Sequence, residues 1–173
     1  MTPRETTMTA MRIDRGSTET TTIYSVDGDL TYERTFDAPR ERVWRALTDP
    51  ELIPRWWGPH GTTTTVAEMD VRPGGHWRFV SSAPDRDDVE FYGEYLEVAP
   101  PGRLRWTFMF DVEGVGPQGG PETMTLEDVG GKTRFTAVGH MGSPEVIEAA
   151  LATGMTKGAI ETYDRLEVLL AER

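Results

Sequence analysis

Between Thr62 and Met141 the sequence alternates between apolar and polar residues, and this alternation restricts the fold more than any other feature. A period of two places successive side chains on opposite faces of a β-strand. Turn-forming residues interrupt the alternation, which therefore predicts strands at residues 63–71, 75–82, 89–97, 103–111, 122–128 and 132–141. Strands that follow one another through such turns form an antiparallel meander.

Strand-forming residues also precede this region. The segment LTYERTF at residues 30–36 adds a strand, which brings the predicted sheet to about seven strands. A shorter strand at residues 22–26 is expected to pair with a neighbouring strand or with a second subunit. The glycine- and proline-rich segment at residues 114–121 is expected to be a flexible connection, either an ordinary hairpin loop, a lid over one end of a cavity or a dimer contact.

Two short helices are predicted after the strand at residues 30–36. Asp37 is expected to cap the first helix, whose apolar face consists of Val43, Trp44 and Leu47. The second helix is predicted to start at Asp49 and to end at Gly58. Trp56 and Trp57 point about 100° apart on a helix, so one is expected to enter the core and the other to lie nearer the rim.

A third helical pattern follows the meander. Apolar residues recur at three- and four-residue spacing from Pro144 to Leu170 and predict one long helix. Gly154 and Gly158 lie inside it, where close packing or a bend is expected. A sheet of this size must bury one face, and this helix is the large element able to cover it. The order of elements therefore predicts an α+β fold.

The alternation also assigns the two faces of the predicted sheet. Charged and polar residues such as Arg78, Glu94 and Arg105 should face solvent. The apolar set, which should face the C-terminal helix, consists of Met69, Trp77, Phe79, Phe91, Tyr95, Leu104, Trp106, Phe108, Phe110, Met124, Leu126, Phe135 and Ala137. One curved sheet covered by one helix often leaves a cleft, and a cleft lined by such residues suits a mostly apolar small molecule.

The length and the N-terminal composition indicate how the chain is divided. A chain of 173 residues can bury the core of one ordinary domain. Residues 1–22 are rich in threonine and lack an apolar period, so they are expected to form a flexible arm before a single domain at residues 23–173. No segment reaches the apolar length of a membrane span, and none resembles a secretory signal, so a cytoplasmic location is expected.

Charge and cysteine content exclude several functions. The net charge of -11 argues against binding of nucleic acid, which requires clustered lysine and arginine. The chain contains no cysteine, so disulfides, thiolate nucleophiles and cysteine-ligated metals are excluded. His60, His76 and His140 do not stand at metal-ligand spacing, so neither a metal nor a cofactor is expected.

Candidates for catalysis are few. His60 follows the Trp-Trp-Gly-Pro segment, where it can hydrogen-bond a ligand or act as an acid or base at the mouth of a cavity. A loop histidine without such a role is the simpler interpretation. Asp70 would point inward if a β-bulge shifted its register, and Tyr92 is the third candidate.

Three segments resemble a known family. FDAPRERVWRALTDPELIPRWWGP, DVRPGGHWRF and YGEYLEVAPPGRLRWTF, followed by the C-terminal helix, resemble activator of heat-shock protein 90 ATPase homologues of the START-like (SRPBCC) superfamily. The resemblance extends over about residues 30–172. It implies a helix-grip fold, in which an antiparallel sheet wraps around a C-terminal helix with a deep hydrophobic cavity between them. It also implies binding of lipid-like or polyketide-like ligands, cyclase or aromatase activity, or contact with a chaperone.

We therefore expect an α+β helix-grip domain that binds an apolar or aromatic small molecule. The side chains expected to line its cavity are Trp57, Trp77, Phe79, Phe91, Tyr95, Trp106, Phe108, Met124, Met155 and Tyr163. One alternative is a cyclase-, aromatase- or hydrolase-like enzyme, which needs an inward polar group such as His60, Asp70 or Tyr92. The other is a chaperone-associated interaction module, and the family resemblance also makes a homodimer plausible.

Overall fold

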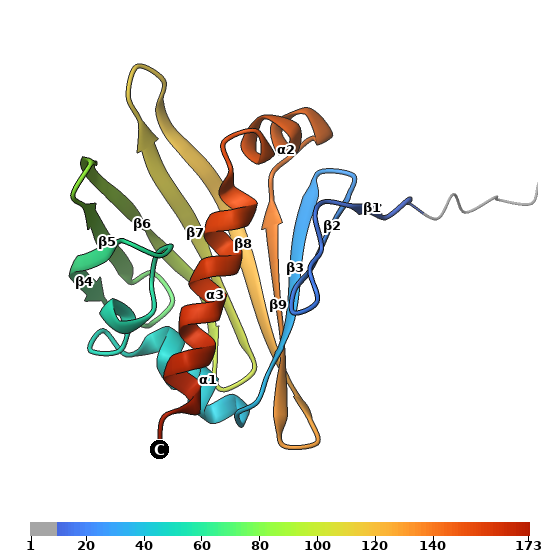
Figure 1. The fold of residues 1–173 in the computed structure, drawn as a ribbon, viewed down its shortest axis with the longest axis vertical. Coiled ribbons are helices and arrows are strands. Elements are labelled where there is room, and N and C mark those ends of the chain that lie inside the picture. Colours follow the sequence, from blue (N-terminus) through green and yellow to red (C-terminus); the bar gives the residue numbers. More distant parts are fainter. Residues whose placement is uncertain (1–9) are drawn as a thin grey trace, which may run out of the picture.

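The computed structural model describes residues 10–173, which form one antiparallel sheet covered on one face by helices (Figure 1). The strands are β1 (Ile13–Asp14), β2 (Thr22–Val26), β3 (Asp29–Phe36), β4 (Thr63–Met69), β5 (His76–Ala83), β6 (Arg86–Ala99), β7 (Arg103–Val112), β8 (Gly116–Val129) and β9 (Lys132–His140). Their order across the sheet is β1-β2-β3-β9-β8-β7-β6-β5-β4. The chain thus runs from one edge to β3, crosses to the opposite edge at β4 and returns strand by strand to β9.

Three α-helices and one 3-10 turn complete the described part of the chain. They are α1 (Arg40–Thr48), the 3-10 turn η1 (Ile53–Arg55), α2 (Pro144–Leu151) and α3 (Met155–Ala171). The 17-residue α3 lies across the concave face of the sheet, and α1 packs beside its C-terminal end (Figure 1). None of the helices described is long and apolar enough to cross a membrane. The arrangement agrees with an α+β helix-grip fold.

The sheet in residues 10–173 has nine strands, so the expected number of about seven was too low. The two additional strands are the short β1 and β2. Thr22–Val26 pairs with β3, one of the two arrangements expected for that segment. β1 lies within the expected N-terminal arm and pairs with β2 through Ile13 and Asp14. Residues 1–9 of that arm lie outside the described residues.

The segment at residues 114–121 is mainly strand and not the expected flexible connection. β7 and β8 pair from Arg103 opposite Thr125 to Val112 opposite Gly116, which leaves a short turn between them. A Cβ atom on Gly119 would lie 1.9 Å from the carbonyl oxygen of Phe108. Glycine therefore permits the close approach of the two strands here, whereas its usual meaning in a sequence is a loop.

The first two helices differ from their predicted limits. α1 has Pro39 at its N-cap position and no capping side chain, so Asp37 does not cap it. The second predicted helix is reduced to the single turn η1, in which Pro54 supplies no N–H for a continuing helix. Asp49 still initiates this turn, because its Oδ1 accepts a hydrogen bond from the N–H of Glu51 at 3.0 Å.

The single helix predicted from Pro144 to Leu170 is two helices. The backbone of Gly154 has a φ of 81°, a left-handed conformation that separates α2 from α3 and confirms the bend expected there. The close packing considered for Gly158 is absent, because no heavy atom lies within 4 Å of where its Cβ would stand. α2 begins with a regular cap, in which the Ser143 hydroxyl accepts a hydrogen bond from the N–H of Val146.

The assignment of the two sheet faces is confirmed. Trp77, Phe79 and Trp106 are buried in the core between the sheet and α3. On the opposite face, Arg78 is paired with Glu90, and Glu94 is exposed. The indole rings of Trp77 and Trp106 stack with their centroids 4.2 Å apart. The apolar alternation therefore faces α3, and the ionic alternation faces solvent.

The glycines of the C-terminal helices give a matched test of this packing. Gly158→Ala should raise the free energy of unfolding by about 0.5–1 kcal/mol, because alanine favours a helix and the space at residue 158 is open. Gly154→Ala should lower it by about 1 kcal/mol or more, because residue 154 has a positive φ. Urea denaturation of the two variants measures both changes. A loss of stability in Gly158→Ala would contradict the packing described for α3.

Candidate functional site

The inner face of the sheet carries a cluster of aromatic rings with Trp57 at its centre. The ring centroid of Trp57 lies 4.9–6.3 Å from those of Trp56, Trp77, Phe79, Phe91, Trp106 and Phe108. Most of these contacts are edge-to-face, an arrangement that aromatic quadrupoles favour. Trp56 is buried and its Nε1 donates to the carbonyl of Ala46, whereas Trp57 is partly exposed. One tryptophan therefore enters the core and the other lies nearer the rim, as expected.

Trp57 differs from its neighbours in one polar atom. Its Nε1 is buried and has no hydrogen-bond partner among the residues that the structure describes. By contrast, Trp77 donates its Nε1 hydrogen to the carbonyl of Thr107 at 3.2 Å. A buried N–H without an acceptor costs about 1–3 kcal/mol relative to one that is bonded. The indole of Trp57 thus fills space well, but its polar group is poorly satisfied in this position.

The backbone that carries Trp57 is fastened to α3 by polar contacts. One guanidinium nitrogen of Arg165 donates to the carbonyls of Trp57 at 3.0 Å and Gly58 at 2.9 Å. The backbone N–H of His60 donates to Oε2 of Glu161 at 3.1 Å. Burial lowers the pKa of Arg165. These contacts hold the segment through its main chain and do not fix the indole itself.

A carboxyl group lies beside the aromatic cluster. Glu122 on β8 stands directly opposite Trp106 on β7, and its Oε1 accepts a hydrogen bond from the Trp106 Nε1 at 3.0 Å. Burial raises the pKa of Glu122, although the hydrogen bond from Trp106 and the nearby His140 act in the other direction. The neutral acid is therefore favoured to a higher pH than for a carboxyl group in water.

Two tyrosines accompany Glu122 from other elements. Tyr32 on β3 is 7% exposed, and its hydroxyl is buried without a hydrogen-bond partner. Burial raises the pKa of Tyr32 to about 12. Tyr163 on α3 packs edge-on against Tyr32, with ring centroids 6.1 Å apart. Burial, followed by the charge of Glu122, raises the pKa of Tyr163 well above its usual value. Both phenols therefore remain protonated donors at neutral pH.

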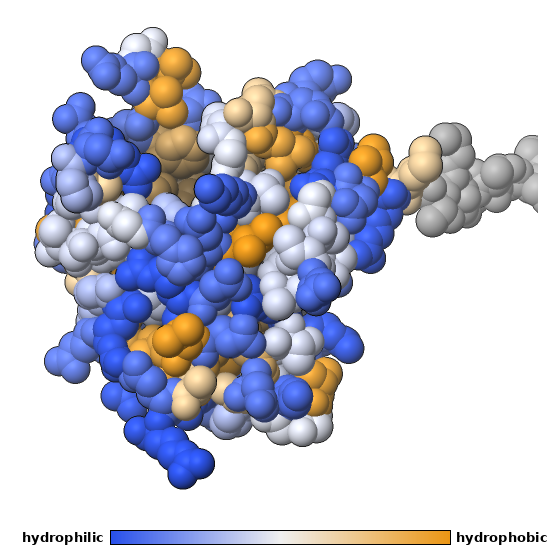
Figure 2. All heavy atoms as spheres, in the orientation of Figure 1, coloured by the Kyte–Doolittle hydropathy of each residue, from blue (hydrophilic) through white to orange (hydrophobic). Residues whose placement is uncertain are grey.

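The ten side chains proposed to line a ligand site form one packed group. Trp77, Phe79, Tyr95, Trp106 and Met124 belong to the buried core. Trp57, Phe91, Phe108, Met155 and Tyr163 are partly buried and packed against it. Figure 2 shows the surface hollowed over β7 and β8, beside the start of α3, with hydrophobic atoms on its floor. Ligand binding by these side chains stays a prediction.

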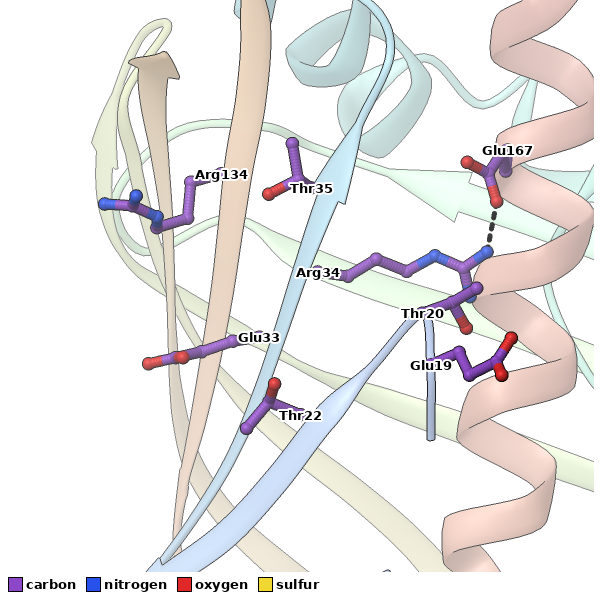
Figure 3. Close-up of a pocket in the computed structure, with 8 residues that line it drawn as sticks. All are labelled: Glu19, Thr20, Thr22, Glu33, Arg34, Thr35, Arg134 and Glu167. Atoms are coloured by element: carbon purple, nitrogen blue, oxygen red, sulfur yellow. Dashed lines mark hydrogen bonds and ion pairs between the residues drawn. The ribbon is translucent and has the colours of Figure 1, made fainter. Parts of the chain in front are cut away.

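Two hollows defined by the structure differ from this one, and Trp77 is the only member of the group that contributes to the lining of either. The second, of about 330 Å³, is on the solvent face of β5 and β6, near His76, Arg78 and Tyr92. The first, of about 410 Å³, lies beside Arg34. Arg34 reaches from β3 toward Glu167 on α3, whereas Glu33 and Arg134 point to the other side of the sheet (Figure 3).

Arg34 acts as an ionic link between the sheet and α3. Its side chain is 2% exposed, and it donates to Oδ1 of Asp164 at 2.7 Å and to Oε2 of Glu167. The carboxylates themselves are 44% and 45% exposed. Two partly hydrated anions therefore compensate one buried cation, which indicates a structural role for the charges beside this hollow.

The structure places the three catalytic candidates outside the aromatic cluster. His60 is exposed in the loop after Trp57, and Asp70 is exposed and paired with Arg72. Tyr92 lies on the solvent face, where its hydroxyl donates to Asp111 at 2.9 Å. The bulge considered for Asp70 does not turn it inward, because β4 ends at Met69. Residues 10–173 hold no group of three His, Cys, Asp or Glu side chains suited to a metal.

His140 takes part in a row of side-chain hydrogen bonds that crosses neighbouring strands on the solvent face. Its Nδ1 is 3.0 Å from Oδ1 of Asp29, and its Nε2 is 3.2 Å from Oγ1 of Thr123. This order of an acid, an imidazole and a hydroxyl is the order of a catalytic triad. Thr123, however, is 9% exposed on a sheet face. The geometry therefore fixes the imidazole ring and does not offer the hydroxyl to a substrate.

The alternation of the sequence carries a signal for Glu122 and Tyr32. Glu122 stands two residues before Met124, so alternation places both on the same face. Tyr32 likewise shares its face with Leu30 and Phe36. Alternation along the strand from residue 122 thus places the Glu122 carboxyl group on the inner face of the sheet.

Comparison with known proteins agrees with the fold. The family model described as Activator of Hsp90 ATPase homolog 1-like protein matches residues 37–171. A solved protein of Rhodobacter sphaeroides is 29% identical, with a TM-score of 0.79 over 87% of this chain and 98% of that one. A protein of Nitrosomonas europaea is 30% identical, with a TM-score of 0.72 over 82% and 93% of the two chains.

A more distant structure shares the fold alone. The AHSA1 protein of Silicibacter pomeroyi is 20% identical, with a TM-score of 0.67 over 83% of this chain and 97% of that one. No protein with a curated description matches the chain. The relatives therefore define a family and a fold, and none of those named here carries a ligand or a reaction in its description.

The partly buried position of Glu122, which raises its pKa, predicts how stability depends on pH. Because the folded-state pKa is raised, the folded protein retains this proton longer than the unfolded chain does. The stabilising contribution is present below the unfolded pKa of about 4.3 and is lost as pH rises through the folded pKa. Glu122→Gln removes this loss, so its stability relative to the unaltered protein should increase with pH, by at most about 1.4 kcal/mol per pH unit.

Urea denaturation of both proteins from about pH 4 to pH 7 measures this difference. Glu113→Gln is the control, because Glu113 is exposed in the turn between β7 and β8. A constant difference between Glu122→Gln and the unaltered protein over this range would contradict the raised pKa of Glu122.

The ionic link predicts that removing its two carboxylates lowers stability more than removing its arginine does. Replacing both Asp164 and Glu167 by their amides leaves the Arg34 cation buried without an anion, which should cost about 3–5 kcal/mol of unfolding free energy. Arg34→Met should cost less, because the two carboxylates it frees can be hydrated where they stand. Chemical denaturation of the two variants decides the order. A larger loss in Arg34→Met would show that the carboxylates are the groups that need compensation.

Proposed function

We propose that this chain, which belongs to the family of activator of Hsp90 ATPase homolog 1-like proteins, binds an apolar or aromatic small molecule on the inner face of its sheet. The family is consistent with a ligand-binding role or with an activator-like role toward a chaperone ATPase. The aromatic cluster favours ligand binding, because its partly exposed rings lie together under α3 and beside a surface hollow.

The observation that carries this proposal is the position of Trp57. A loop side chain occupies the centre of the ring cluster, and its Nε1 finds no acceptor there. In other words, an aromatic ring that is not part of the sheet or of α3 fills the space where a flat ligand would stack. Turning outward would let the indole N–H bond to water, while the aromatic walls kept their shape.

The energies of the two states of Trp57 are comparable. Burying a large aromatic side chain contributes about 3 kcal/mol, and the unpartnered N–H costs about 1–3 kcal/mol of this. An outward conformation therefore lies about 0–2 kcal/mol above the packed one. A ligand whose ring replaces the indole can supply that difference, since its stacking contacts are the same as those that Trp57 gives up.

Trp57→Ala is the direct test of this proposal. It should bind naphthalene about tenfold or more tightly than the unaltered protein, because it vacates the space of one indole and keeps the surrounding rings. Trp44→Ala is the matched control, because Trp44 is also partly buried but lies on α1, outside the ring cluster. Titration calorimetry measures the affinities, and circular dichroism checks that both variants are folded.

Equal naphthalene affinity in Trp57→Ala and Trp44→Ala would contradict the proposal. Native mass spectrometry of freshly purified unaltered protein gives an independent measurement. A retained molecule with an apolar or aromatic body is the expected result, and its release on heating would identify the ligand class.

A further inference from the structure

A strip of small side chains separates Glu122 from Tyr32 on the inner face of the sheet. β9 lies between their strands, with Gly139 opposite Glu122 and Ala137 opposite both Tyr32 and Met124. A Cβ on Gly139 would be in ordinary contact with Sδ of Met141 at 3.7 Å and the carbonyl oxygen of Leu30 at 3.8 Å. The carboxyl group and the phenol therefore stand on either side of a low floor, with Tyr163 of α3 nearby.

We propose that Glu122 and Tyr32 form the polar end of the ligand site and together hold a carbonyl oxygen that is conjugated to an aromatic ring. This inference rests on the proposed function, because the ring of that ligand would occupy the cluster around Trp57. Trp106 connects the two parts, since it stacks on Trp77 and bonds to Glu122. The ligand class is thus a flat aromatic ketone, with its oxygen directed toward β3 and β8.

The hydrogen-bonding capacity of the two side chains supports this assignment. The Tyr32 hydroxyl is buried and, among residues 10–173, has no partner within hydrogen-bond distance. The Thr156 side chain on α3 is near enough to act on its pKa but does not meet that distance, so the hydroxyl has a hydrogen to donate. A protonated Glu122 accepts the Trp106 N–H on one oxygen and can donate the O–H of the other. If both donors reach one acceptor oxygen, they recognise a carbonyl and reject a hydrocarbon of the same shape, which would leave both donors unbonded.

Glu122 must be protonated to donate, and its surroundings determine when it is. Burial favours the neutral acid. The titratable groups that act on this region are His140 from β9, Tyr32 from β3 and Tyr163 from α3, and Arg34 acts through Tyr163. Only His140, on the solvent face, attracts the carboxylate directly. Carbonyl binding should therefore weaken as pH rises through the raised pKa of Glu122, because a carboxylate repels the ligand oxygen.

Two probes of nearly equal size separate this inference from the proposed function. 2-Acetylnaphthalene and 2-ethylnaphthalene differ by one carbonyl oxygen, and both should bind to Trp57→Ala. The ketone should bind about tenfold more tightly below the raised pKa, as expected for hydrogen bonds that a hydrocarbon leaves unmade. Calorimetric titration from pH 5 to about pH 8 measures this preference and its dependence on pH.

Three substitutions in the Trp57→Ala background test the two donors. Glu122→Leu and Tyr32→Phe should each remove most of the preference for the ketone and leave the affinity for 2-ethylnaphthalene unchanged. Glu122→Gln should retain a preference that no longer varies with pH, because its amide donates in every protonation state. Gly139→Ala adds a methyl group between Glu122 and Tyr32 without a close contact. It should weaken binding of the ketone more than that of the hydrocarbon.

The outcomes distinguish the two proposals. If neither naphthalene derivative binds, the proposed function fails and this inference fails with it. If both bind with equal affinity, the aromatic site stands and the carbonyl-binding role of Glu122 and Tyr32 is overturned. A ketone preference that persists unchanged in Glu122→Leu and in Tyr32→Phe would also overturn it.

Discussion

The fold depends on burial of one face of a wide sheet by little helical material. Seven strands from β3 to β4 present apolar side chains to the same side, and the 17-residue α3 is the main helix across them. One helix is about 10 Å wide, about the spacing of two strands, so it covers part of such a face. The remainder has to be covered by α1, η1 and the loop after η1. Trp57 lies in the cluster because that loop completes the cover over β5, β6 and β7.

The same constraint explains which polar groups are buried and how. Arg34 is tolerated beneath α3 because two carboxylates on that helix reach it from its partly hydrated side. Glu122 has no cation in hydrogen-bond contact and receives one hydrogen bond, from Trp106. For a carboxyl group in an apolar setting with no cation beside it, the protonated form has a lower free energy than the charged form. A structural ion pair and a partly buried carboxyl group with a raised pKa thus occur on the same sheet face, and only the carboxyl group retains hydrogen-bonding capacity for another molecule.

The sequence predicted the parts of this architecture that a repeating pattern controls. Alternation predicted the strands from Thr63 to His140 and the face that each side chain occupies. With a period of two, every second side chain of a strand lies on the same face, so the apolar residues identify the inner face. It did not predict β1, whose two residues carry no period. The turn-forming residues at positions 114–121 predicted a flexible connection, and this prediction was wrong. Gly119 and its neighbours allow the strands to pair there instead of ending them. The sequence predicted a bend at Gly154. It did not predict that one helix ends and another begins there.

The candidate site was only half accessible to sequence reasoning, for a related reason. The ten proposed lining residues follow from alternation and helical period, and they do lie together. The inward polar group required by the enzymatic alternative was sought among residues that look chemically active in isolation, such as His60 and Tyr92. It occurs instead at Glu122, where a glutamate continues an apolar alternation and is held by Trp106 of the neighbouring strand. Its environment depends on cross-strand pairing, which no single strand of the sequence displays.

Helix α3 contacts both ends of the proposed site. Arg165 and Glu161 hold the backbone of residues 57–60, and Tyr163, between them in sequence, packs over Tyr32. A small shift of α3 would therefore change both the loop that carries Trp57 and the cover over the polar end. Because the Arg165 contacts are to backbone carbonyls, the indole can turn while they persist. Under the proposed function, the loop would then act as a cover with a fixed attachment and a movable side chain, which a ligand could replace without disturbing the sheet.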